Sequence, residues 1–102
     1  MIVPKQYQDL IDTYGELSPE ALNLTPPEYM TVAQLDEAIK QAGDPEAAFK
    51  TAIDPILRSF NPSGDPVSVD DPRAAGSVAA YREITDRAVA HLNELKAERA
   101  RR

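Results

Sequence analysis

Prolines are concentrated in the first part of the chain, where they limit the length of every helix except the last. All nine lie between Pro4 and Pro72, and the 30 residues from Arg73 to Arg102 contain none. Because proline lacks a backbone N–H and clashes with the carbonyl four residues back, a helix accepts it mainly in its first turn. The pattern predicts an all-α fold: several short capped helices and one long C-terminal helix over about residues 72–100.

Cap residues and apolar residues at helical spacing mark each of the short helices. Thr31 with Gln34 and Thr25 with Glu28 both have the spacing of a capping box, in which side chains and backbone N–H groups bond reciprocally at a helix start. Isolated glycines follow the apolar runs and indicate helix ends. The expected helices cover about residues 4–14, 19–23, 32–42 and 45–60, with a brief helical segment after Thr25.

Pro55 lies inside the apolar pattern of the helix expected over residues 45–60. A proline at this position removes one backbone hydrogen bond from the helix. We therefore expect a bend at Pro55 rather than a helix interior. The helix either kinks there or stops and restarts with Asp54 as its cap.

Charge divides the chain into an acidic and a basic part. Residues 1–71 carry 13 acidic and 4 basic side chains, a net charge of −9, whereas residues 72–102 carry a net charge of +3. We interpret residues 1–102 as a single small helical domain, with an acidic body over 1–60, a Pro/Gly loop over 61–71 and a basic-ended long helix over 72–102. Because a nucleic-acid binder is usually basic overall, we do not expect direct binding of nucleic acid.

Composition excludes several classes of site and location. The chain has no cysteine and one histidine, so a disulfide framework, a Cys-type zinc site and a His-rich metal site are excluded, and we expect no cofactor. Its apolar runs are far too short to span a membrane. The first residues lack the basic start and apolar stretch of a secretory signal. We therefore expect the protein in the cytoplasm, or in a particle assembled there.

No group of residues predicts a catalytic centre. His91 is the only side chain with an ordinary pKa near neutrality, and on the long helix it lies at the edge of the apolar stripe. No serine or carboxylate is placed beside it as a nucleophile–base pair requires, so we expect a solvent-edge histidine. Asp70 and Asp71 have the positions of turn and cap residues. The sequence thus predicts a protein that is not an enzyme.

The long helix carries a heptad-like apolar stripe, which Ile84 and Val89 widen. This stripe packs either on the chain's own earlier helices or on another chain. Because the earlier helices are short, we expect them to cover the first half of the long helix and to leave its last turns projecting. Deleting residues 96–102 should then leave the melting temperature little changed. The predicted partner-binding residues are Tyr81, Leu92, Leu95, Lys96, Arg99, Arg101 and Arg102.

These observations favour a structural function. Leu, Ile, Val and Phe total only 22 residues, which predicts a thin core. We interpret the chain as a non-enzymatic assembly or adaptor subunit that contacts other protein subunits in a homo- or hetero-oligomer, for example within a large particle such as a phage virion. One alternative is an acidic inhibitor that blocks a host or nucleic-acid-binding protein. Another is a small enzyme that uses Asp, Glu and His91.

Overall fold

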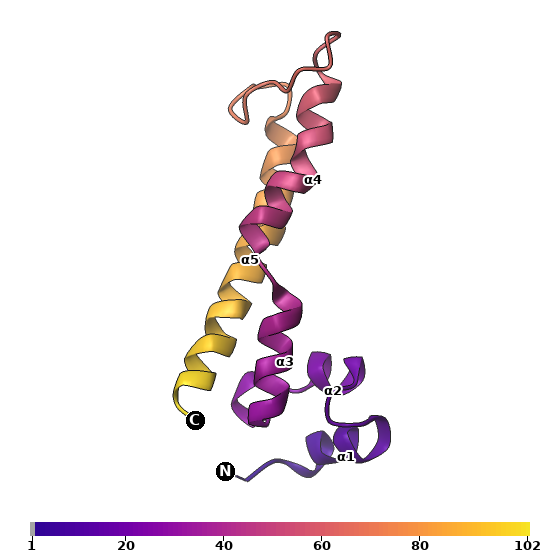
Figure 1. Cartoon of the computed structure of the whole chain (residues 1–102), viewed down its shortest axis with the longest axis vertical. Coiled ribbons are helices and arrows are strands. Elements are labelled where there is room, and N and C mark those ends of the chain that lie inside the picture. The colour runs from indigo at the N-terminus through magenta and orange to yellow at the C-terminus, as the bar shows by residue number, and fades with distance from the viewer. Residues whose placement is uncertain (1) are drawn as a thin grey trace. The chain divides into compact units, whose positions relative to one another are not determined.

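A computed structural model describes residues 2–102 and confirms the all-α fold (Figure 1). The described part of the chain contains no β-strand. Four helices and one 3₁₀ turn precede the long helix, as the proline spacing predicts. In chain order the elements are α1 (Lys5–Tyr14), α2 (Pro19–Leu24), η1 (Pro27–Tyr29), α3 (Val32–Ala42), α4 (Pro45–Ser59) and α5 (Ala75–Ala100).

Side-chain caps begin α2, α3 and α4, as the sequence predicts. Ser18 accepts a hydrogen bond from the backbone N–H of Ala21, and Asp44 accepts two from the first turn of α4. The capping box at α3 is complete: the Thr31 hydroxyl accepts from the Gln34 N–H, and the Gln34 side chain accepts from the Thr31 N–H. Each cap satisfies donors that an uncapped helix would leave unpaired.

The second predicted capping box, at Thr25, is wrong. Thr25 does not cap the start of the following helix, which is a 3₁₀ helix that begins only at Pro27, with Pro26 as its preceding residue. The reason is the Pro-Pro pair: a residue before proline is held in extended conformation, and Pro26 has a ψ of 148°. Helix therefore cannot start at Pro26. The Thr25 hydroxyl is buried instead, and it has no hydrogen-bond partner among the described residues.

Pro55 lies inside helix α4, which continues through it. The prediction that the helix interior excludes Pro55, with a stop and restart at Asp54, is therefore wrong. Two features make the position tolerable. Ile53 and Leu57, on either side of Pro55, are buried in one core and hold the two parts of the helix together. Pro55 itself and Thr51, whose carbonyl loses its usual partner, are both exposed, so the carbonyl without a helix partner lies on a solvent-facing part of α4. A kink at this position stays a prediction.

Helix α5 begins at Ala75, three residues later than the sequence predicts. Residues 71–75 form a tighter turn, in which the N–H groups of Ala74 and Ala75 bond to carbonyls three residues back. Asp71 accepts hydrogen bonds from the Arg73 side chain and backbone N–H, and these bonds lower the pKa of Asp71. The ion pair therefore stabilises a turn where the pattern predicts the first turn of a helix.

The chain divides into two compact units. The terminal unit consists of the segment that ends at Gly43 together with His91–Arg102, and its core is Met30, Leu35 and Leu95. The hairpin unit is Asp44–Ala90. Its buried core is small, and its members are Phe49, Ile53, Leu57 and Ala74, with Phe60, Val67 and Val78 packed against them. The predicted division into acidic body, loop and basic-ended helix stays a prediction.

Helix α5 contributes apolar side chains to both cores. Ala74, directly before α5, and Val78 pack in the hairpin unit, and Leu95 packs in the terminal unit. The apolar stripe of the long helix is therefore used, at these positions, by the chain's own helices. For these residues, the alternative in which the stripe packs on the chain's own earlier helices is confirmed.

Replacement of Thr25 by valine tests the cost of its buried hydroxyl. Thr25→Val removes a polar group without a partner and keeps nearly the same shape, so we expect the free energy of unfolding to rise by about 1 kcal/mol and the melting temperature by roughly 4–8 °C. Thr31→Val is the matched control, because that hydroxyl caps α3, and its loss should lower stability by about 1 kcal/mol. Thermal unfolding followed by circular dichroism measures both, and a lower melting temperature for Thr25→Val would contradict the assignment.

Candidate partner-contact surface

The hairpin unit is built from α4 and the first part of α5, which lie side by side in antiparallel directions and are joined by the loop after Phe60 (Figure 1). Only one sector of each helix is buried between them. Two-helix packing of this kind leaves two flanks, one along each side of the contact line. The two flanks of this hairpin differ in chemistry.

One flank is polar and is fixed by Arg82. Its guanidinium donates to Glu46 at 2.7 Å, lies 3.8 Å from Asp86 and covers the Phe49 ring at 4.0 Å from the ring centre. The hydrogen bond that Arg82 donates to Glu46 raises the pKa of Arg82. This arrangement covers one face of the Phe49 ring and joins α4 to α5 on this side.

The opposite flank is apolar. On α5, Tyr81, Ile84 and Ala88 are exposed at i, i+3 and i+7, and at 100° per residue Ile84 lies about 160° around the helix from Arg82. On α4, Ala48 lies the same angle around the helix from Glu46 and is exposed. Ala52 and Ile56, one and two turns later on that side, are half-buried. We name this surface the apolar flank. Its members are Ala48, Ala52, Ile56, Tyr81, Ile84 and Ala88.

Ile84 is the most exposed large side chain of the apolar flank. Its exposed fraction is 62%, against 38% for Tyr81. The sequence pattern identifies Ile84 as a residue that widens the stripe, but it does not show which sector of α5 is covered by α4. That sector follows from the packing of Phe49, Ile53 and Leu57, which use the face of Ala74 and Val78. Ile84 is therefore a candidate contact residue whose exposure only the tertiary packing reveals.

Of the predicted partner-binding residues, Leu92 and Leu95 do not project. Both are buried, and Leu95 packs against Met30 and Leu35 in the terminal unit. The prediction that the last turns of the long helix stay uncovered is therefore wrong. The physical reason is that α3 and the segment before it cover the last turns of α5, a pairing that helix length alone does not predict.

The basic residues near the end of α5 have different surroundings. Lys96 is exposed. Arg99 donates to Asp36 of α3 at 2.7 Å, and both side chains are about half exposed. Arg101 pairs with Glu98 and is 67% exposed. Their assignment to a partner contact stays a prediction.

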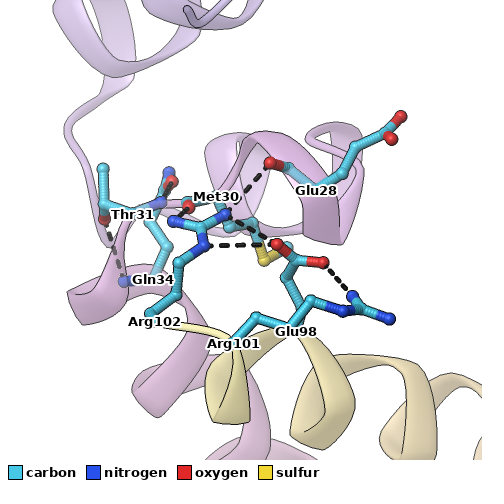
Figure 2. Close-up of polar contacts among 7 residues, drawn as sticks. All are labelled: Glu28, Met30, Thr31, Gln34, Glu98, Arg101 and Arg102. Atoms are coloured by element: carbon cyan, nitrogen blue, oxygen red, sulfur yellow. Dashed lines mark hydrogen bonds and ion pairs between the residues drawn. The ribbon is translucent and has the colours of Figure 1, made fainter. Parts of the chain in front are cut away.

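Arg102 is held within the chain (Figure 2). Its guanidinium donates to the backbone carbonyls of Met30 at 2.9 Å and Glu28 at 3.0 Å, and it pairs with Glu98 at 3.1 Å. Only 19% of its side chain is exposed. We expected deletion of residues 96–102 to leave the melting temperature little changed because this end would contribute little to the fold. That reason is wrong, because Arg102 ties the end of α5 to the backbone that precedes α3.

Two open pockets lie in the terminal unit. The larger, about 320 Å³, is lined by Pro26, Pro27, Ala97, three glutamates and Arg101. The smaller, about 200 Å³, is lined by residues that include Leu22, Leu95 and His91. His91 is exposed, as a solvent-edge histidine should be. Among residues 2–102, no three His, Asp or Glu side chains are grouped as metal ligands.

No helix in the described range combines the length and apolar content needed to cross a membrane. No family model matches the chain, and no curated protein or solved structure gives a significant match.

Replacement of Arg102 by alanine tests its role within the fold. Arg102→Ala removes charged hydrogen bonds to two backbone carbonyls, so we expect a loss of about 1–2 kcal/mol in the free energy of unfolding and of roughly 5–10 °C in melting temperature. Arg101→Ala, the adjacent control with the same change in charge, should lose less than about 0.5 kcal/mol. Denaturant unfolding of both variants measures the difference, and equal losses would contradict the role of Arg102.

Proposed function

We propose that the protein is a non-enzymatic helical assembly or adaptor subunit that acts by binding other protein subunits. The apolar flank carries this proposal. It is built from two helices, has an exposed isoleucine and tyrosine at its centre and contains no charged side chain. Contiguous apolar surface bordered by polar residues is typical of a protein–protein contact.

The energetics of the apolar flank support binding. Complete burial of a fully exposed isoleucine contributes about 1.5–3 kcal/mol, and Ile84, which is 62% exposed, still has most of its area to bury. Tyrosine is enriched among the residues that dominate binding energy, because its ring is large and its hydroxyl remains able to bond at the edge of a contact. Tyr81, the one residue of the flank that the sequence also predicts for partner binding, is suited to this position.

The acidic residues support an assembly subunit over an acidic inhibitor. A protein that imitates nucleic acid presents rows of unpaired acids, whereas many acids here are paired within the chain. Examples of such pairs are Asp36 with Arg99, Glu46 with Arg82, Asp54 with Arg58 and Asp71 with Arg73. We extend the proposal to a component of a large particle such as a phage virion, assembled in the cytoplasm, on the sequence argument alone.

Introducing a charge into the apolar flank tests the proposed function. Ile84→Glu places a carboxylate at the centre of the apolar flank, so we expect the immobilised protein to lose at least ten-fold in capture of its partner proteins from a lysate of its natural source. Leu24→Glu is the matched control, since Leu24 is 61% exposed and lies in the terminal unit. Circular dichroism should show both variants folded. Equal capture by wild type and Ile84→Glu would contradict the proposal.

A further inference from the structure

Helix α1 has few of the features that stabilise a helix by itself. It has 10 residues, and isolated helices shorter than about 12–15 residues are marginal in water. No side chain caps its first turn, in contrast to α2, α3 and α4. Lys5 stands in its first turn and Asp12 in its last, so both charges oppose the helix dipole. The stability of α1 therefore depends on its contacts with the rest of the terminal unit.

These contacts consist of partial apolar packing. No residue of α1 is fully buried, and Tyr7, Leu10 and Ile11 are half-buried. The Tyr7 ring stacks on the ring of Tyr29 in η1, with 5.3 Å between the ring centres. Among the described residues, those before Gly15 form hydrogen bonds only with one another and with Gly15. A segment with so few buried contacts opens at a lower free energy than the core.

The chain is anchored directly after α1. The Glu16 carbonyl accepts a hydrogen bond from the side chain of Gln34 at 2.9 Å, and the Glu16 carboxylate accepts one from the Thr31 hydroxyl. Gln34 itself is fully buried. Gly15, between α1 and this anchor, has a φ of 102°, which glycine adopts without strain. The boundary between the weakly held and the firmly held part of the terminal unit therefore lies at Gly15.

We propose that α1 is a detachable cover over Tyr29. In the open form α1 leaves the terminal unit and unfolds, while the core of Met30, Leu35 and Leu95 stays intact. The opening uncovers the ring of Tyr29, on which Tyr7 stacks in the closed form. It requires no partner, and it is separate from the apolar flank, which lies in the hairpin unit.

Hydrogen exchange measures the opening in the full chain. For the backbone amides of residues 9–14 we expect protection factors below about 10³, at least about ten-fold lower than those of residues 37–40 in α3. Arg102→Ala removes a contact that holds the terminal unit together, so it should accelerate exchange in α3. Exchange in α1 should stay unchanged, because α1 opens while the core is folded. Equal protection of α1 and α3 would overturn the proposal.

Two substitutions at Asp9 test whether α1 unfolds when it opens. Asp9 is exposed in the middle of α1, and Asp9→Gly and Asp9→Ala remove the same carboxylate. The two variants differ mainly in helix propensity, which favours alanine over glycine about five-fold. Exchange in α1 should therefore be about five-fold faster in Asp9→Gly than in Asp9→Ala, and exchange in α3 should be the same in both.

Nitration by tetranitromethane tests whether the opening uncovers Tyr29. Mass spectrometry of peptides gives the rate at each tyrosine ring. Nitration of Tyr29 should be faster in Asp9→Gly than in Asp9→Ala, because a larger fraction of the molecules is open. Tyr81, in the hairpin unit, is the internal control and should react equally in both variants.

Three results would overturn the detachable cover. If α1 opened only when the whole terminal unit unfolds, Asp9→Gly would accelerate exchange in α1 and α3 by the same factor. If α1 left as an intact helix, exchange in α1 would be alike in the two Asp9 variants. If nitration of Tyr29 were equal in both, α1 would unfold without uncovering this ring. Each of these results leaves the binding of partner proteins at the apolar flank untouched.

Discussion

The fold depends on how the apolar residues of α5 are buried, because its 26 residues exceed the length of every helix available to cover it. Each unit solves this problem over its own stretch of α5. In the terminal unit Leu95 is covered by Met30 and Leu35, and in the hairpin unit α4 covers Ala74 and Val78. In the hairpin unit one helix, α4, packs against one helix, α5, so each covers only one sector of the other. The apolar flank is the part of their apolar surface that stays exposed.

The short-range features of the fold were predictable from the sequence because they depend on neighbouring residues. The box formed by Thr31 and Gln34 and the cap at Asp44 are complete within three residues. The predictions at Thr25 and Pro55 were wrong for reasons that also lie in neighbouring residues. A second proline blocks the helix start after Thr25, and burial of residues on both sides outweighs the bond lost at Pro55.

The candidate surface was predictable only in part. Tyr81 follows from the stripe, but the choice of Ile84 over Leu92 and Leu95 depends on which helix packs where. That choice is made by contacts between residues far apart in sequence, such as Leu35 with Leu95. Helical periodicity assigns these leucines to an apolar face, but it does not say whether the face meets the same chain or another one.

The contacts of Arg102 have a consequence for how this protein can change during evolution. Two of its acceptors are main-chain carbonyls, which every amino acid supplies. The side chain at position 28 is exposed, so substitutions there leave the acceptor intact provided that the turn keeps its shape. We therefore expect the arginine at position 102 to be retained while the residue at position 28 varies. The two positions would then show no correlated substitutions, although they are in contact.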